Sequence, residues 1–457
     1  MTTPSRTKRV APDWLSGAFS ALLLVNFTGA LGFSIVMPFL VFLVHKWGGN
    51  ALIYGLVSAA YSVFQLIGSP VLGRWSDRYG RKRILFLSQL GTALSWMVVL
   101  AAFYIPASAV LNVDSSLLGK FSLTLPLILL FLARSVDGLT GGDVSVANAY
   151  VADITPKDAR EERFGKMAAS SNVGYIIGPA LAGILGGTVL GFELPVLAAL
   201  GIALLAMTLV VVKLPKTQPC AAGLDPHAAN AHKVMGQEHR ACIQPKTLGK
   251  MSNWDLVRLP GVAVLMAIYF LVMLAFNFFY VAFPVQAASE MKWSVQHTGA
   301  FFSVMSFFMV VVQGPVLSRV SRIWKARRLV VVGSLVLGFG FLCLVPAIGW
   351  LAFAGAVLIA VGNGLMWASV VALLSQAAGQ QQGAVQGLAG SVGAAASIMG
   401  LTLAGILYDQ ISGWLFVISA GCIFGVVVLS AFFPRDKLAS EAGPRRTGST
   451  DGKKKVA

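Results

Sequence analysis

The sequence predicts an all-α membrane protein with twelve transmembrane helices in two pseudo-symmetric bundles of six. Three observations support this prediction: an apolar composition, a series of membrane-length apolar runs and an internal repeat. Hydrophobic residues make up 56% of the 457 residues and charged residues only 12%, whereas soluble domains carry about 25% charged residues. A chain of this length cannot bury so much apolar surface in one soluble core.

Twelve apolar runs follow one another along the chain, many of them roughly 20 residues long, which is the length that crosses a bilayer as a helix. The first six are Ala18–Val44, Leu52–Leu72, Ile84–Ile105, Leu123–Ala147, Gly165–Leu190 and Leu194–Val212. The second six are Val262–Val285, Thr298–Leu317, Leu329–Ile348, Leu351–Ala377, Ala384–Leu407 and Trp414–Phe433. The 48 glycines fit this interpretation, because Gly lets membrane helices approach closely.

The basic residues are distributed very unevenly between the two sides of the membrane. The net charge is +17, yet all but four of the 35 lysines and arginines fall at the termini or in alternate loops. The exceptions are Lys46, Lys120, Arg134 and Lys292. Lys and Arg are enriched in cytoplasmic loops, so we expect both termini in the cytoplasm. The excess of positive charge then needs no nucleic-acid partner to explain it, although it favours contact with anionic lipids.

The polar stretch between the sixth and seventh runs divides the chain. We predict an N-terminal bundle over 1–213, a cytoplasmic linker over 214–258, a C-terminal bundle over 259–434 and a disordered basic tail over 435–457. The two bundles repeat each other: Pro70–Ser76 ends the second run and the similar Pro315–Ser321 ends the eighth. Parallel repeats of six spans suit alternating access, in which a solute site lies between the halves.

The fourth run contains a charge pair, Arg134 and Asp137. A charge inside a membrane helix costs at least about 2.5 kcal/mol, so it rarely persists without a function. Positions three apart share a helix face, which allows the two side chains to pair. Pairing favours an ionised Asp137 and burial favours a neutral one, so this carboxylate could exchange protons. The alternative is a structural ion pair. Asp143 lies near the helix end, where we expect a wetted charge.

The loop after the second run reads Gly73-Arg-Trp-Ser-Asp77-Arg78-Tyr-Gly80-Arg81-Lys82. Its glycines permit a tight turn, and its carboxylate suits the positive end of the next helix. The string resembles the signature between the second and third spans of the major facilitator superfamily, with Trp75 where Leu is usual. The resemblance implies a cytoplasmic gate motif that latches the outward-facing state, made of Gly73, Asp77, Arg78, Gly80, Arg81 and Lys82. The alternative is a charged loop that only sets topology.

Two further strings narrow the resemblance to the twelve-span drug:proton antiporters of the superfamily, such as tetracycline-efflux-like and multidrug exporters. Arg134 with Gly138 is similar to the motif of the fourth span, which implies proton coupling through Arg134 and Asp137. The fifth run carries Gly174, Gly178, Pro179 and Gly183, which resemble the antiporter motif. Small residues allow close helix crossing and Pro can bend a helix, so generic packing is the alternative interpretation.

One departure from the tetracycline pumps concerns the first run. Those proteins carry an Asp a few residues before a string that Gly32–Pro38 matches, and here Gly29 stands at that position. This argues against tetracycline itself as the solute. Amides and aromatics of the runs predict a mostly apolar solute cavity. Its candidate residues are Asn26, Gln65, Asn277, Phe278, Tyr280, Gln313 and Asn363. Any of the amides could instead bond to a neighbouring helix.

We therefore expect a monomeric, multi-pass transporter of the bacterial inner membrane that exports a small amphipathic solute or drug in exchange for protons. Two alternatives are a facilitator or exporter of a natural metabolite (a sugar, siderophore or lysolipid) without obligatory coupling, and a non-transporting receptor. We expect no enzymatic activity, no cofactor and no metal. The chain has no Gly-rich phosphate loop for ATP, and the Cys and His spacing of the linker matches no zinc pattern.

Overall fold

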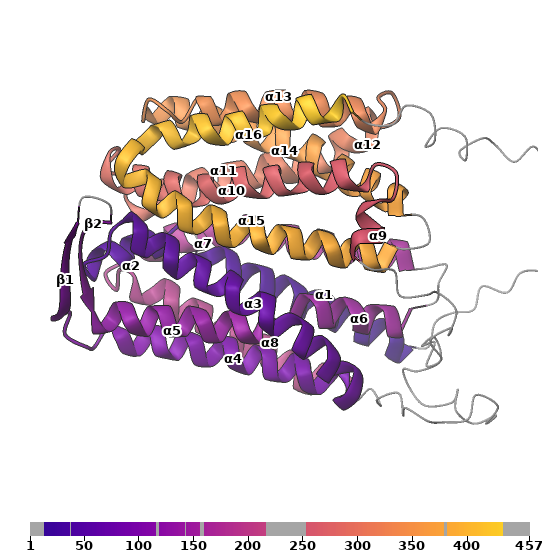
Figure 1. The fold of residues 1–457 in the computed structure, drawn as a ribbon. Coiled ribbons are helices and arrows are strands. Elements are labelled where there is room, and N and C mark those ends of the chain that lie inside the picture. The colour runs from indigo at the N-terminus through magenta and orange to yellow at the C-terminus, as the bar shows by residue number, and fades with distance from the viewer. Residues whose placement is uncertain are drawn as a thin grey trace, which may run out of the picture.

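The computed structural model describes residues 13–36, 38–115, 118–141, 143–155, 160–215, 253–378 and 382–432. Long helices run side by side in two groups, one from each half of the sequence (Figure 1). Most of the predicted linker and all of the segment after Phe432 lie outside the described residues. The linker cysteines and histidines are among the residues left out.

The N-terminal half contains eight described helices and one pair of strands. The elements are α1 (Asp13–Val36), α2 (Leu40–Lys46), α3 (Ala51–Tyr79), α4 (Arg81–Ala102), β1 (Ala109–Ser115), β2 (Gly119–Thr124), α5 (Leu125–Thr140), α6 (Asp143–Asp153), α7 (Arg160–Gly186) and α8 (Glu193–Lys213). Two membrane-spanning units consist of a pair of helices, α1 with α2 and α5 with α6. The other four consist of one helix each, α3, α4, α7 and α8.

All the regular elements in the described part of the C-terminal half are helices. The elements are α9 (Asn253–Val257), α10 (Val262–Ser289), α11 (Val295–Val311), the π-turn η2 (Val312–Val316), α12 (Leu317–Val320), α13 (Ala326–Leu342), α14 (Gly349–Ala378), α15 (Gln382–Ile411), the short η4 (Ser412–Trp414) and α16 (Leu415–Ser430). Here α11, η2 and α12 together form one spanning unit, while α10, α13, α14, α15 and α16 form one each.

The helices agree with the predicted twelve spans. Among the described residues, nine segments are long and apolar enough to cross a membrane. One of these, Gly387–Ser430, covers two successive helices, α15 and α16. Two more spanning units fall outside that count because their helices are short: α5 has 16 residues and α13 has 17.

Helix packing repeats between the halves. In the N-terminal half α1 packs on α7 and α8, α3 on α5, and α4 on α5 and α8. In the C-terminal half the equivalent units pair in the same way: α10 packs on α15 and α16, α11 on α14, and α13 on α14 and α16. The repeated sequence strings therefore reflect a repeated architecture of two six-span bundles.

Four helices, here called the interface helices, join the halves: α3 packs against α15 and α7 against α11. We call the end of the molecule that carries β1 and β2 the hairpin end, and the end at which α3 meets α4 the basic end. Near the hairpin end a Cβ added to Gly405 would lie 2.8 Å from the Ala51 carbonyl oxygen, and one added to Gly299 would lie 2.7 Å from that of Pro179. The backbones of the halves are therefore in contact there.

The same helices separate toward the basic end. Toward that end, a Cβ added to any of five glycines on these spans would meet no described atom within 4 Å, and they are Gly73, Gly165, Gly314, Gly387 and Gly390. Figure 1 shows α3 and α15 close together beside the strands and diverging away from them. The structure therefore has the halves closed at the hairpin end and apart at the basic end.

The β-hairpin was not predicted from the sequence. It places Leu123 in β2, so the fourth span begins two residues later, with α5 at Leu125, than the predicted run Leu123–Ala147. The hairpin is tied to the first loop, because the Ser122 amide donates to the Gly48 carbonyl (2.9 Å) and the Thr124 hydroxyl to the Trp47 carbonyl (2.8 Å). An alternation of polar and apolar residues in β2 suits a half-exposed strand.

The fourth span is also interrupted, which corrects the single continuous helix expected from its apolar run. It breaks after Thr140, and α6 starts at Asp143. Irregular backbone at membrane depth must find hydrogen-bond donors within the protein. Here Ser88 donates to the Thr140 carbonyl (2.5 Å), and Gln65 and Ser69 donate to that of Gly141 (3.1 and 3.3 Å). Side chains of α3 and α4 thus stabilise the break.

Candidate functional site

The charge pair predicted in the fourth span forms inside the N-terminal bundle. Arg134 and Asp137 both lie on α5, only 7% and 9% exposed. The Arg134 Nη1 donates to the Asp137 Oδ2 at 3.0 Å. One turn of helix holds the two side chains on one face, as their spacing of three residues requires.

Neighbouring helices supply the remaining partners of this pair. The hydroxyl of Thr92 on α4 donates to the Asp137 Oδ1 at 2.8 Å. The Arg134 guanidinium lies 4.5 Å from the ring centroid of Tyr61 on α3, in a cation–π contact. The Arg134 Nε is buried and has no hydrogen-bond partner among the described residues. The arginine therefore depends on one carboxylate and one aromatic ring for its stabilisation, so a change in the charge of Asp137 acts directly on it.

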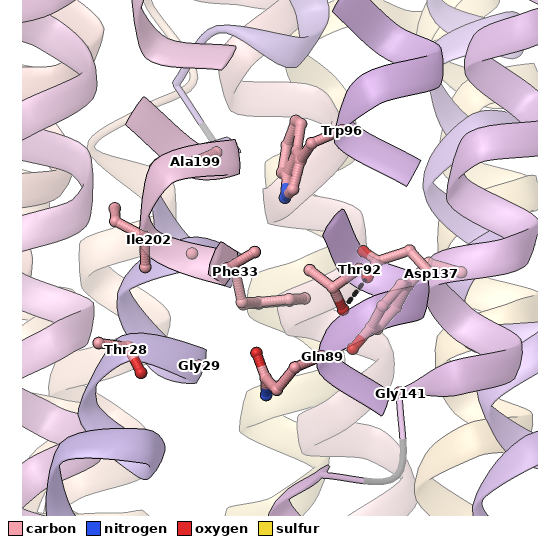
Figure 2. A pocket seen from close by; sticks show the side chains of 13 residues that line it. Thr28, Gly29, Phe33, Gln89, Thr92, Trp96, Asp137, Gly141, Ala199 and Ile202 are labelled. Carbon is pink, nitrogen blue, oxygen red and sulfur yellow. Dashed lines mark hydrogen bonds between the residues drawn. The ribbon is translucent and has the colours of Figure 1, made fainter. Parts of the chain in front are cut away.

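A small cavity adjoins Asp137. Its volume is about 40 Å³, and it is lined by Thr28, Gly29, Gly32, Phe33, Tyr61, Gln89, Thr92, Trp96, Asp137, Gly141, Ala199, Ile202 and Ala203. Figure 2 shows Gln89, Thr92 and Asp137 on one side of it and α1, with Thr28 and Gly29, on the other. The cavity is large enough for a few water molecules, since each needs about 10–15 Å³.

The polar lining of this cavity was missed at the sequence level, although the third span carries a signal for it. Gln89, Thr92 and Trp96 follow the spacing i, i+3 and i+7, so they share one face of α4. That face carries an amide and a hydroxyl within a mostly apolar span, and its Thr92 reaches Asp137 of α5. None of the seven side chains predicted to line a solute cavity contributes to it.

The predicted cavity residues of the N-terminal half make hydrogen bonds between helices. Asn26 donates to the Met167 carbonyl (2.7 Å) and to the Ser171 hydroxyl (2.6 Å), which joins α1 to α7. Gln65 donates to the Tyr61 hydroxyl (3.0 Å) and supports the break at Gly141.

The predicted cavity residues of the C-terminal half lie at several depths of their bundle. Asn277 donates to the Ser397 hydroxyl (3.1 Å) and Asn363 to the Met309 sulfur (3.6 Å), both within the half. Phe278 is buried in the same half. Two of these residues accept hydrogen bonds from the other half: Tyr54 donates to the Tyr280 carbonyl (3.1 Å), and Asn172 to the Gln313 Oε1 (3.5 Å). The structure does not gather the seven residues in one pocket.

The gate motif at the basic end is organised around Arg81. This residue is 6% exposed and bonds to Asp77 (2.6 Å), Asp153 (2.9 Å) and the Ser76 hydroxyl (2.5 Å). The Asp77 side chain, by contrast, is 59% exposed. Gly80 adopts a positive φ of 96° in the turn between α3 and α4, a region that favours glycine.

Two more members of the gate motif lie at its edges. Lys82 donates to the Val211 and Leu214 carbonyls (2.7 and 2.6 Å) at the end of α8, where cations favour the helix dipole. The Arg78 guanidinium lies 5.5 Å from the centroid of the Tyr79 ring and stays at the exposed surface. The motif is thus anchored within the N-terminal half, with Gly73 and Asp77 on its open side.

The fifth-span motif brings α7 against two different helices. A Cβ on Gly174 would lie 2.7 Å from the Phe27 carbonyl oxygen, and one on Gly178 would overlap Ser34, so both glycines permit close contact with α1. A Cβ on Gly183 would instead lie 3.3 Å from the Gly299 Cα of α11. Pro179 lies within the helix between these contacts. The motif therefore serves packing both inside its half and across the interface.

Metal ligands are not brought together in the part of the chain that the structure describes: it holds no cluster of three or more His, Cys, Asp or Glu side chains. Cys343 and Cys422 are free thiols in that part. The side chain of Asp143 and the linker residues Cys220 and Cys242 lie outside it.

Comparison with known proteins places this architecture in a large family. The sequence profile of the Major Facilitator Superfamily matches residues 22–263 and 265–455. The tetracycline resistance protein of class G from Vibrio anguillarum is 28% identical over 418 residues, which is 89% of this chain and 94% of that protein. The multidrug resistance protein 2 of Bacillus subtilis (strain 168) is 27% identical over 410 residues, 86% of this chain and 88% of that protein.

Solved structures share the fold. The human organic anion transporter MFSD10 (TETRAN) superimposes with a TM-score of 0.61 at 20% identity, covering 92% of this chain and all of that one. The xylose transporter XylE from E. coli, in a partially occluded inward open conformation, gives 0.68 at 14% identity, covering 93% and 98%. The chain is a membrane transporter rather than an enzyme, and it belongs to the Major Facilitator Superfamily.

Proposed function

We propose that this protein exports a small amphipathic solute or drug across a bacterial inner membrane in exchange for protons, by alternating access. The observation that carries the proposal is the charge pair of Arg134 and Asp137, held inside one of two bundles that are closed against each other at the hairpin end and stand apart at the basic end. The curated relatives, whose names describe tetracycline and multidrug resistance, support the export of drug-like solutes.

The coupling step follows from the environment of the pair. When Asp137 takes up a proton, it loses its charge. Arg134 is then left with the Tyr61 ring and a Nε for which the described part of the chain offers no hydrogen-bond acceptor. A buried cation without a counter-ion costs several kcal/mol. A conformation that gives Arg134 a new partner or water then becomes more favourable, so protonation shifts the equilibrium between the states of the two halves.

The gate motif supports the second part of the cycle. Gly73 and Asp77 lie at the basic end of α3, where the halves stand apart. In the opposite state this end closes, and we propose that α15 then approaches the open face of Gly73 while Asp77 gains a partner on it. Arg81, fixed by Asp153, holds the motif in position during both states.

We place the basic end in the cytoplasm, because the lysines and arginines of the chain concentrate there. The described state then opens inward, ready to receive a solute from the cytoplasm. The transporter acts as a monomer whose basic loops contact anionic lipids. The solute site lies between the halves, where Gln313 and Tyr280 make contacts across the interface. The candidate amides Asn26, Gln65, Asn277 and Asn363 bond within the halves on either side of it.

Everted membrane vesicles with a pH-sensitive acridine dye test this proposal. Vesicles are acidified by respiration, and tetracycline, ethidium, lysolipids and sugars are added one at a time. An exported solute should raise the internal pH. Asp137→Asn should abolish this response. Asp114→Asn, which removes an acid from an exposed pair with Lys120 on the hairpin, is the matched control and should retain it.

Two other outcomes would replace the proposal. Movement of a labelled solute without any pH response would make the protein a facilitator and leave Arg134 and Asp137 a structural role. Binding without movement would make it a receptor. Gly29 in place of an acid on the first span leads us to expect that tetracycline is not the best solute in the screen.

A further inference from the structure

The cavity beside Asp137 lies wholly within the N-terminal half. Its lining residues come from α1, α3, α4, α5, α8 and the break after α5, and none comes from the C-terminal half. The solute site proposed above lies between the halves instead. The acid therefore borders a compartment that is separate from the proposed solute site.

Its size limits what the cavity can hold. About 40 Å³ is available, whereas sites for drug-sized ligands measure about 300–1,000 Å³. A buried water needs about 10–15 Å³ and two to four polar partners. The occupant that fits is a short row of water molecules.

The lining offers such partners. Gln89 and Thr28 are 3% and 4% exposed, and with Thr92 and Asp137 they bring two hydroxyls, an amide and a carboxylate to one small space. Trp96 and Ile202 contribute apolar walls. Figure 2 shows the Gln89 side chain reaching into the space between α1 and α4. Polar groups thus run from α1 to the carboxylate.

We propose that this cavity is a water site through which protons reach and leave Asp137, so that protons and solute use separate compartments. The inference rests on the proposed function. In the uptake step a hydronium ion in the cavity transfers its proton to a carboxylate oxygen of Asp137, which leaves a water molecule and a neutral acid. Release is the reverse. The Thr92 hydroxyl, now a donor to Oδ1, can turn to accept from the acid.

The chain offers a matched pair of glycines to test the route. A Cβ on Gly32 would point into the cavity, 3.8 Å from the Ile202 Cγ2, so Gly32→Val fills space that water would occupy. Gly201 lies on α8 next to Ile202, but it faces outward, and a Cβ there would meet nothing within 4 Å. Gly201→Val is therefore the control for a valine in a membrane helix.

The experiment is infrared spectroscopy of the reconstituted protein. The carboxyl stretch of protonated Asp137 is identified by its loss in Asp137→Asn, and its shift is timed after exchange from H₂O to D₂O. We expect Gly32→Val to slow the shift by about tenfold, equivalent to about 1.4 kcal/mol in the barrier. Gly201→Val should exchange at the wild-type rate. If Gly32→Val fails to fold, Thr92→Val, which keeps the shape of the side chain, should show the same slowing.

The outcomes separate the two proposals. The water route would be overturned if the band titrates normally in Gly32→Val but exchanges at the wild-type rate. The same holds for Thr92→Val where that variant is used. Either result would leave antiport intact. A protein with no such band at any pH would remove Asp137 as the proton carrier, and the route would fall with it.

Discussion

Asn50, the residue that caps α3, donates its side-chain amide to the Asp409 carboxylate of α15 at 3.0 Å. The same amide nitrogen donates to the Leu118 carbonyl of the hairpin turn (2.9 Å), and the side-chain Oδ1 of Asn50 accepts from the Ile53 backbone amide (3.2 Å). One side chain thus links the start of α3, the hairpin and the C-terminal half. It does so at the end where the halves are closed.

This relationship predicts a shift between conformational states. Asn50→Ala should weaken the closed hairpin end by about 1 kcal/mol, the usual worth of one hydrogen bond, and so change the ratio of the two states about fivefold. Spin labels on the basic ends of α3 and α15 would report this shift as a larger share of short distances between the two labels. An unchanged distance distribution would show that the glycine contacts alone close this end. Asn112→Ala, which removes a side-chain amide of the hairpin strand β1, is the control.

The glycines of α15 predict opposite effects at its two ends. Gly405→Leu should force the halves apart where they touch, because the new side chain would meet the Ala51 carbonyl. Gly390→Leu meets open space in the described state and should leave that state intact. Cysteine cross-linking across α3 and α15 at the hairpin end would measure this, with loss expected only in the first variant. Equal cross-linking in both would contradict the packing described here.

The charge pair predicts that the two partners differ when removed. Asp137→Asn leaves Arg134 without its counter-ion and should lower stability, but it keeps the side-chain shape and an oxygen that can accept from Thr92 and Arg134. The protein should therefore still fold while it loses proton coupling. Arg134→Ala should lower stability by about 3–5 kcal/mol, because it leaves the buried carboxylate without its counter-ion. Thermal unfolding in detergent, followed by tryptophan fluorescence, would compare the two. Equal melting temperatures would mean that Asp137 is already neutral in the described state.

The gate motif predicts a separation of stability from transport. Asp153→Asn removes a partner from buried Arg81 and should lower the melting temperature. Asp77→Asn alters an exposed side chain and should change it little. Its effect should instead appear in transport, since Asp77 is proposed to act when the basic end closes. Wild-type export by Asp77→Asn would reduce the motif to a topological role.

The sequence by itself determined the fold class and the repeat. Runs of membrane length, few charges and two similar strings at equivalent positions leave little choice, because in a bilayer each span must satisfy its backbone hydrogen bonds within its own helix. That same local rule places Arg134 and Asp137 on one helix face. The family could likewise be recognised from short local strings such as Gly73–Arg83.

Only the tertiary structure decided what lies around the pair and which end of the molecule is closed. Thr92 and Tyr61 reach Asp137 and Arg134 from other helices, and no spacing within one span specifies a neighbour in another. The break at Gly141 is stabilised by side chains of α3 and α4, so an apolar run cannot reveal it. Asn50 and Asp409, 359 residues apart, meet only when two complete bundles are packed together.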